Sequence, residues 1–515
     1  MGDALVHTTI GDVPAFIDMR GGPRICGLVF RVGWADETLP IRGLTHLVEH
    51  LALFEAGGER LPVNGFVEAH RTTFVIRGTD EEVVRFFHIL TDALDELPMS
   101  RLEAEARVLE TESAGRNSTA HSALLAWRYG AAGYGLEGYP EFALSAPQPE
   151  RVADWCQSKF TKGNAAFWAS GALPDDLSIP LRDGALIEPP KPDPLSFPLP
   201  AWFEERSRIV AMSFVLPEGD AVTLASKVLE HRIHDRLRRQ EGRSYQIATV
   251  IDQWAAGWVH GMIAADGLAE HFADIRDGIL AEVGRLSVDP PKSEELASLL
   301  RDAERGWTAP DAGAFIAGGA ASNILIGRRV RAVDDALDEL HAVGPDDVCA
   351  VARDLLATAL VQVPTGTGWQ DRRYVRAPGW ADRAATGRTY VRSATLSDST
   401  AGHTLIVGDE GASYVHDEQR RSSIWYHTCV AMQVWTDGAR TMWGRDGLRI
   451  FVHPNEWLNG DAAVAAIDAR VSPQVIVPMG KAAGSSYLDR VQNEHPPQAQ
   501  PPASRRGFLR RRSTS

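Results

Sequence analysis

The stretch GLTHLVEHLALFEAGG, from Gly43 to Gly58, carries two histidines four positions apart, with a glutamate directly before the second. If this stretch is a helix, His46 and His50 project from one face, because residues i and i+4 are neighbours on a helix surface. Two imidazoles placed in that way can share one zinc ion. The apolar side that would bury the helix consists of Leu47, Val48, Leu51, Leu53 and Phe54. The stretch is therefore either a core helix with two structurally satisfied histidines or the metal-binding face of an enzyme.

The order His-x-x-Glu-His, formed by His46, Glu49 and His50, is the inverzincin signature. A catalytic zinc ion takes three protein ligands and keeps one position for water, so the motif needs a third ligand. The segment SRLEAEARVLETESAG, residues 100–115, supplies four candidate carboxylates: Glu103, Glu105, Glu110 and Glu112. Glutamates clustered on a helix usually form a solvated face, and that interpretation stands beside the ligand hypothesis.

Composition and charge restrict the class of protein. The chain has 515 residues, which predicts about three domains, and its 44% hydrophobic and 23% charged residues are ordinary for a globular protein. The net charge of -15 argues against nucleic acid as a partner. We expect no secretory signal, because the N-terminus lacks a basic segment before an apolar run. We also expect no membrane span, because no apolar run approaches the length that a span needs.

Cysteine usage points to a reducing compartment. Four scattered cysteines form no Cys-x-x-Cys pair: Cys26, Cys156, Cys349 and Cys429. They are expected to be reduced and mostly buried, which predicts a cytoplasmic protein in which cysteine does not bind zinc.

Breaks in composition divide the chain. The stretch PPKPDPLSFPLP, residues 189–200, cannot continue a helix or a central strand and is expected to be a linker. A stretch containing Gly, Arg and Pro follows Thr365. We therefore predict domains at 1–188, 201–365 and 394–480, followed by a disordered basic tail at 491–515. The tail's arginines could touch acidic lipid, although a solvated tail is the simpler interpretation: Arg505, Arg506, Arg510, Arg511 and Arg512.

The first two predicted domains repeat one order of elements. Each reads as a strand, a helix, a strand pair and a long helix, beginning at RICGLVFRVGW in the first copy and at RIVAMSFVL in the second. That order predicts an internal repeat of an α+β unit. The second copy has Glu230 and His231, but Lys227 stands where the first histidine would be. Only the first copy is therefore expected to be catalytic.

Four motifs in the same order resemble the pitrilysin/insulinase family of zinc metallopeptidases, which includes the processing peptidases. They are GLTHLVEHL, the segment NGFVEAHRTTFVIRG from Asn64, the helix EARVLETE from Glu105 to Glu112, and LRRQEGRSY with Arg238 and Tyr245. The resemblance covers about residues 1 to 360. It implies two homologous α/β-sandwich domains that form half of a clamshell around the substrate.

The resemblance also implies roles for the matching residues. His46, His50 and Glu112 would hold one Zn²⁺ per chain, with Glu110 as the competing third ligand. Glu49 would be the general base, and Glu105 would support the site from behind. Arg238 and Tyr245 would donate to the substrate carbonyl. The strand with Asn64 and Phe66 would pair with the peptide backbone.

Two features depart from the family pattern. The family inserts a helix where this chain has only the short segment between Glu59 and Asn64, and Gly65 and Val67 replace the usual residues on the edge strand. We therefore expect the first domain to be trimmed beside the active site, which affects substrate preference more than zinc binding.

The third domain does not resemble a peptidase. Runs of β-formers separated by Asp-Gly turns, with a closing helix near Asp461, look similar to pleckstrin-homology-like domains. Its tryptophans are expected to pack in a core rather than form a ligand cage: Trp425, Trp435, Trp443 and Trp457. Because the peptidase motifs end earlier, we expect peptide hydrolysis not to require residues 371–515.

The sequence thus predicts a zinc-dependent endopeptidase that cleaves short or unfolded peptides. The alternative is a catalytically inactive peptide-binding or regulatory subunit of a heterodimeric peptidase. The resemblance implies a homodimer, or a heterodimer with a similar chain of the family.

Overall fold

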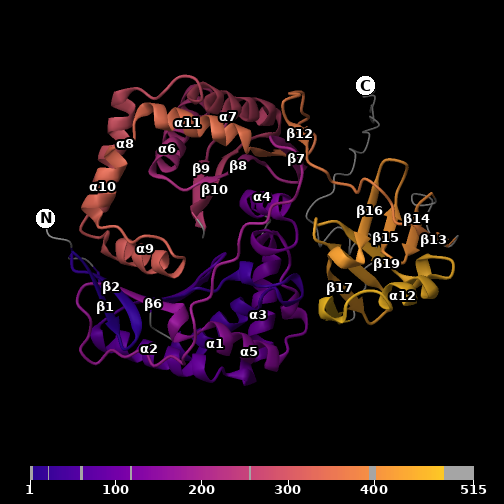
Figure 1. Ribbon diagram of the computed structural model, residues 1–515, viewed down its shortest axis with the longest axis horizontal. Coiled ribbons are helices and arrows are strands. Elements are labelled where there is room, and N and C mark those ends of the chain that lie inside the picture. Colours follow the sequence, from indigo (N-terminus) through magenta and orange to yellow (C-terminus); the bar gives the residue numbers. More distant parts are fainter. Residues whose placement is uncertain are drawn as a thin grey trace, which may run out of the picture.

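The computed structural model describes residues 4–20, 23–57, 62–115, 119–254, 257–393 and 402–480. These residues form three units, which Figure 1 shows as an indigo-to-purple first unit, a magenta-to-orange second unit and an orange-to-yellow third unit. No helix in the described ranges is long and apolar enough to cross a bilayer. All four cysteines are buried and free, as predicted.

The first unit is built on a mixed six-stranded sheet with the order β1-β2-β6-β3-β5-β4. Its strands are β1 Leu5–Ile10, β2 Val13–Asp18, β3 Ile25–Phe30, β4 Val63–Val67, β5 Thr72–Arg77 and β6 Ala165–Ser170. Its helices are α1 Leu44–Gly57, α2 Asp80–Asp95, α3 Leu102–Gly115, α4 Ala120–Tyr129 and α5 Pro149–Lys159. Leu47, Val48 and Leu51 of α1 enter a core shared with α2 and the sheet, so the apolar stripe fixes which side of α1 faces outward.

The second unit has a sheet with the order β12-β7-β11-β8-β10-β9. Its strands are β7 Ala201–Glu205, β8 Ile209–Pro217, β9 Ile247–Trp254, β10 Trp258–Asp266, β11 Leu360–Pro364 and β12 Val375–Arg376. Its helices are α6 Asp220–His234, α7 Phe272–Leu286, α8 Ser293–Thr308, α9 Gly313–Leu325, α10 Val333–His341 and α11 Pro345–Ala357.

The strand pairing confirms the internal repeat. In the first sheet β2 and β6 are parallel, whereas β3 pairs antiparallel with both β6 and β5. In the second sheet β7 and β11 are parallel, and β8 pairs antiparallel with both β11 and β10. The two edges that carry β4 and β9 also correspond, since each strand pairs antiparallel with its neighbour.

The predicted domain boundaries need adjustment at two places. The Pro-rich segment 189–200 lies inside an irregular connection between β6 and β7, in keeping with a linker. The second unit extends past the predicted end at 365, because β12 pairs with β7. The third unit begins before the predicted 394, because β13 Gly387–Val391 pairs with β14 Thr404–Gly408.

The third unit consists of two four-stranded sheets, β13-β14-β15-β16 and β19-β18-β17-β20, together with one described helix, α12 Gly460–Asp468. The remaining strands are β15 Gly411–Val415, β16 Arg421–Trp425, β17 Cys429–Trp435, β18 Arg440–Gly444, β19 Arg449–Val452 and β20 Ile476–Met479. The unit is mostly β with a helix near Asp461, as expected, but β20 follows that helix and pairs parallel with β17. The pleckstrin-homology-like assignment stays a prediction. The tail predicted at 491–515 lies outside the described residues, as does most of the trimmed segment after Glu59.

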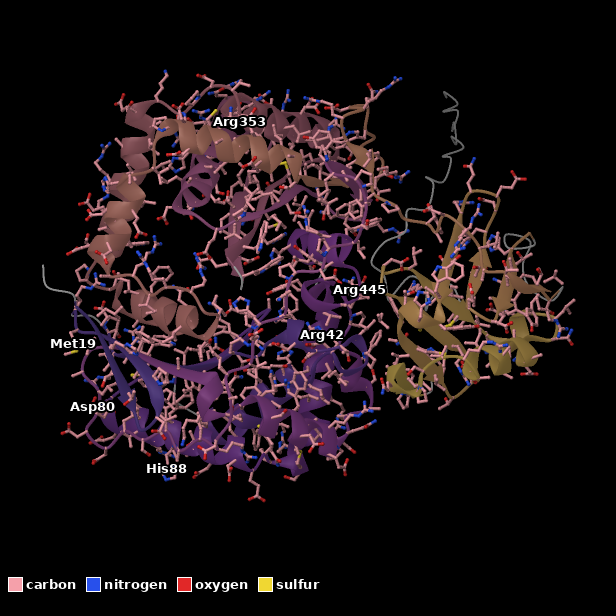
Figure 2. The ribbon with its side chains drawn as sticks, viewed as in Figure 1. Met19, Arg42, Asp80, His88, Arg353 and Arg445 are labelled. Atoms are coloured by element: carbon pink, nitrogen blue, oxygen red, sulfur yellow. The ribbon has the colours of Figure 1, made fainter. Side chains whose placement is uncertain are left out.

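The three units share apolar cores. Helix α9 belongs to the second unit by sequence, but Ala317, Ala320 and Ala321 pack against the first sheet (Figure 1). Trp443 of the third unit is fully buried in a cluster that contains Trp34 of the first unit and Trp254 of the second. Figure 2 labels Arg445, whose guanidinium donates to the carbonyls of Tyr129 and Asp193. The third unit is therefore not an independent appendage.

Candidate active site

Helix α1 presents its polar side to a cavity of about 1020 Å³. His46, Glu49 and His50 line that cavity, while the apolar side of the same helix is buried. One part of the sequence prediction is wrong here: Phe54 does not enter the core but is 47% exposed, with the Arg101 guanidinium 4.2 Å from its ring centroid.

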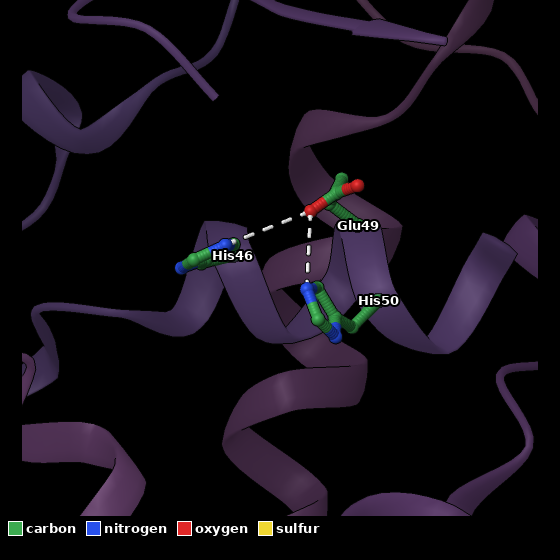
Figure 3. Close-up of side chains that lie close together, drawn as sticks. All are labelled: His46, Glu49 and His50. Carbon is green, nitrogen blue, oxygen red and sulfur yellow. Dashed lines mark ion pairs between the residues drawn. The ribbon is translucent and has the colours of Figure 1, made fainter. Parts of the chain in front are cut away.

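The two histidines converge on Glu49 (Figure 3). The Nε2 atom of His46 and the Nε2 atom of His50 each lie 3.8 Å from Glu49 Oε2. The imidazole rings are 5.1 Å apart and nearly perpendicular. Ligand atoms of all three residues lie within 4.8 Å of one another, so the motif forms one cluster, as the i, i+4 spacing predicted.

A buried carboxylate holds the rear nitrogen of each histidine. His46 Nδ1 lies 3.0 Å from Glu141 Oε1, and His50 Nδ1 lies 3.4 Å from Glu105 Oε2. In the tautomer with hydrogen on Nδ1, each Nδ1–H donates to its carboxylate, and the lone pair of Nε2 is directed into the cluster. The supporting role predicted for Glu105 fits this contact, whereas sequence reasoning missed Glu141.

Glu141 lies in a buried polar network at the wall of the cavity. It directly precedes the 3₁₀ helix Phe142–Ser145, and its carboxylate also accepts from Arg42 Nη1 at 3.3 Å and from Ser113 Oγ at 3.1 Å. Burial alone would raise the pKa of Glu141, but its bonds to His46 and Arg42 outweigh burial and lower that pKa to about 2. Glu141 is therefore ionised and able to orient His46.

The histidines respond differently to the same surroundings. Burial would lower the pKa of His46, but the hydrogen bond to Glu141 and the nearby carboxylates raise it overall. Burial and the neighbouring His46 lower the pKa of His50, and Glu105 opposes them only in part. The site therefore concentrates negative charge around His46 and favours a neutral His50 ring.

Helix α3 brings Glu112 rather than Glu110 toward the histidines. Glu112 Oε2 lies 3.9 Å from His50 Nε2. Glu105 and Glu112 are seven positions apart, two turns of helix, so both side chains share the face that meets α1. Glu110 lines the same cavity but belongs to another face. The arrangement favours Glu112 as the third ligand.

The edge strand β4 borders the cavity. Asn64, Gly65 and Phe66 all line it, and Phe66 is 46% exposed. Because β4 is the last strand of its sheet, its outer edge can accept an extended peptide. Gly65 faces Glu49 so closely that a Cβ atom there would lie 2.1 Å from Glu49 Oε1. The absence of a side chain at Gly65 therefore leaves the space that the Glu49 carboxylate occupies.

Arg238 and Tyr245 contact each other, but they do not line the cavity that contains His46. The Arg238 guanidinium lies 4.9 Å from the Tyr245 ring centroid, and that ring is 76% exposed. Arg238 is in the π-helical turn Asp235–Gln240, and Asp266 Oδ1 accepts the backbone N–H of Tyr245 at 2.9 Å. Among the described residues, every one that lines the His46 cavity comes from the first unit, so the structure does not bring this pair into the site.

The second repeat has replaced the metal motif by an ion pair. Lys227 Nζ donates to Glu230 Oε2 at 3.0 Å on α6. An ammonium at the position of the first histidine repels a cation, which agrees with the prediction that only the first repeat carries the site.

The residues present fit a zinc ion. Two histidines with carboxylate partners behind them and an acidic third ligand match the donors that zinc prefers, and the partners fix the tautomer that coordination needs.

Comparisons with known proteins support the fold. No family model and no curated protein matches the sequence. Among solved structures, a protease from Helicobacter pylori superposes with a TM-score of 0.59 at 14% identity, over 70% of this chain and 99% of that one. An M16 peptidase inactive domain from Pseudomonas fluorescens gives 0.56 at 13% identity, over 70% and 98%. The first half of the periplasmic protease PqqL from Escherichia coli gives 0.55 at 13% identity, over 70% and 92%. The chain therefore has an M16 peptidase-like fold, the pitrilysin-like type that the motifs indicated, and proteases and an inactive domain share that fold.

Proposed function

We propose that the protein is a zinc-dependent endopeptidase that cleaves short or unfolded peptides. The observation that carries the proposal is the pair of histidines whose rear nitrogens are anchored on buried carboxylates while both Nε2 atoms face Glu49. A core helix with structurally satisfied histidines needs no such convergence on the wall of a large cavity.

The ligands in this proposal are His46, His50 and Glu112, one zinc ion per chain. Zinc bound there would polarise the scissile carbonyl and lower the pKa of a water molecule. Glu49 lies 3.8 Å from both Nε2 atoms and does not need to be a ligand. Its carboxylate accepts the proton of the attacking water and passes it to the leaving amine.

Substrate recognition would use the open edge of β4. Backbone groups of Val63, Gly65 and Val67 face away from β5, because Asn64 and Phe66 direct theirs toward it, and they can pair with an extended peptide whatever its sequence. The exposed side chains of Asn64 and Phe66 border that edge, and Phe66 offers an apolar contact. A short or unfolded peptide can present both edges of an extended backbone, whereas most backbone groups of a folded protein are already paired, which is the reason to expect short or unfolded substrates.

Arg238 and Tyr245 enter the proposal as donors to the substrate carbonyl. In this structure they are outside the cavity lining, so that role requires a second unit, from this chain or from a partner chain, to close over the site. The similarity to one half of a two-part protease favours a dimer with a second chain of this type.

The alternative is a catalytically inactive, peptide-binding or regulatory subunit. One structure with the same fold is named an inactive domain. Against this alternative, the chain keeps His46, Glu49 and His50 in one cluster, with Glu112 Oε2 3.9 Å from His50 Nε2.

Glu49→Gln separates the two functions, since it keeps the side-chain shape but removes the base. Zinc content and peptide affinity should match the wild type, whereas the rate of peptide cleavage should fall roughly 10²–10⁴-fold. Glu110→Gln, on the same cavity wall, is the matched control and should cleave normally. Wild-type protein that binds zinc and peptide yet cleaves nothing, even with partner chains added, would establish the inactive subunit instead.

A further inference from the structure

A second cluster of metal-ligand residues lies where the first and second units meet. His121 from the first turn of α4 contacts Asp252 of β9, with Nε2 and Oδ2 2.6 Å apart. His260 of β10 lies on the other side of that carboxylate, with Nδ1 3.5 Å from the same Oδ2. The ligand atoms of all three residues lie within 4.8 Å of one another. None of these residues belongs to the His46 site.

The fold explains why these distant residues meet. Asp252 and His260 are direct cross-strand partners in the β9–β10 pair, so their side chains are neighbours on one face of the second sheet. Helix α4 of the first unit shares a core with that sheet through Ala123 and Leu124. This packing delivers His121 to the pair, so the cluster bridges the two units.

His260 is the least explained residue of the cluster. Its side chain is fully buried and stacks on Trp254, with ring centroids 5.1 Å apart and planes 5° apart. Within the described chain, neither of its ring nitrogens makes a hydrogen bond. Buried polar atoms rarely go without a partner, and each such case calls for one. A metal ion beside Asp252 would bind the lone pair of His260 Nδ1, the ring nitrogen that lies 3.5 Å from the carboxylate.

The distances suit a tetrahedral ion. Ligand atoms at about 2.0–2.1 Å from zinc lie about 3.3 Å apart. The separations of 2.6 Å and 3.5 Å around Asp252 bracket that value, so small side-chain shifts would complete the site. Glu137 Oε2 lies 3.0 Å from His121 Nδ1 and places a negative charge on the side of the ring away from Asp252.

We propose that His121, Asp252 and His260 form a second site for a divalent transition metal, best suited to zinc, which ties the first unit to the second. The two histidines and one carboxylate are donors that zinc accepts, and Glu137 adds a second negative charge beside them. Asp252 is 34% exposed, so the ion has a route from solvent.

The test counts zinc in a variant without the first site. His46→Ala/His50→Ala protein, loaded with zinc and freed of excess by gel filtration, should retain one ion per chain. Adding His260→Phe should reduce that to none. Phenylalanine keeps the stack on Trp254 and removes only nitrogens that make no hydrogen bond. His231→Phe, which changes an exposed histidine of α6, is the control and should leave the count at one.

Three further measurements distinguish loss of the metal site from misfolding. Zinc should raise the Tm of the His46→Ala/His50→Ala protein but not of the His260→Phe derivative, whose Tm in chelator should equal that of its parent. Asp252→Asn, a separate variant of the same size, should weaken zinc binding at least tenfold. Cobalt(II) substituted for zinc should give the visible absorption of a tetrahedral site, lost with His260.

The possible results distinguish a failure of the second metal site from a failure of the proposed peptidase. If the His46→Ala/His50→Ala protein binds no zinc while the wild type binds one ion, the second site is refuted and the first stands. If the wild type binds one ion that His260→Phe removes, the second site stands and the peptidase proposal loses its metal. Unchanged zinc content in both the His260→Phe and Asp252→Asn derivatives also refutes the second site.

Discussion

Glu141 offers a sharp test of how the site is held together, because it acts on His46 from behind. Its carboxylate accepts from His46 Nδ1 at 3.0 Å, from Arg42 at 3.3 Å and from Ser113 at 3.1 Å. Glu141→Gln preserves the volume and one acceptor oxygen but removes the charge. The substitution therefore perturbs the basicity and orientation of His46 without touching the face that would bind zinc.

The expected magnitude follows from these contacts. Loss of a carboxylate partner behind a metal-binding histidine weakens metal affinity by about 10–100-fold, which is about 1.4–2.7 kcal/mol. Arg42 keeps a second partner, since its Nη1 also lies 3.2 Å from Glu37 Oε2, so no buried guanidinium is left alone. The free energy of unfolding should thus fall by no more than about 1–3 kcal/mol, the cost of weakening a buried hydrogen bond.

Zinc affinity is measured by competition with a chelator, and peptide hydrolysis is followed as zinc is added. Glu141→Gln should need 10–100-fold more free zinc for half-maximal activity, and saturating zinc should restore most of the rate. Ser113→Ala is the matched control, because it removes a neutral contact to the same carboxylate and should change zinc affinity less than threefold. Equal zinc affinity in Glu141→Gln and wild type would show that Glu141 does not support the metal site.

Three further predictions test other parts of the structure. Glu112→Ala should remove most bound zinc whereas Glu110→Ala should not, as metal analysis can establish; the reverse result would mean that the α3 register is misassigned. Gly65→Ala should leave zinc in place but slow cleavage by about 10²-fold, because the new Cβ displaces Glu49, and an unchanged rate would contradict that close approach. Burial raises the pKa of Glu205 from 4.5 to about 8, so stability should fall as pH rises through that window. Glu205→Gln should therefore stabilise the fold by at most about 5 kcal/mol above pH 8 and hardly at pH 4.5, as urea unfolding at both pH values would show.

Local signals in the sequence explain why the repeat could be predicted. Helix α2 shows the pattern well: Thr79 caps it, Glu82 completes the capping box, and Phe86 and Leu90 fall on one buried face. The same holds for His46 and His50, whose geometry depends only on being four positions apart in a helix. Features encoded within one or two turns can be read without knowing the fold.

The residues that escaped prediction depend on contacts between distant segments. Glu141 is 95 positions from His46, in a segment with no recognisable ligand spacing. His121 and Asp252 are 131 positions apart and belong to different units. No periodicity or motif links such residues; only the packing of α4 on the second sheet brings them together. The placement of Arg238 and Tyr245 outside the cavity lining likewise depends on how two units are oriented, which the motif order does not contain.

The third unit shows how a change in composition along the chain can mislead about the independence of a domain. The composition break after Thr365 marks a real change of architecture, and we expected hydrolysis to survive without residues 371–515. However, Trp443 is fully buried and packs against Tyr139 and Phe142, with ring centroids 5.9 and 5.8 Å apart. These two residues flank Glu141, the partner of His46. Removing the third unit would expose that cluster and remove support from the segment that carries Glu141, the partner of His46. This packing argues against an independent third unit, and the expectation that hydrolysis survives without residues 371–515 stays a prediction for a truncated protein to test.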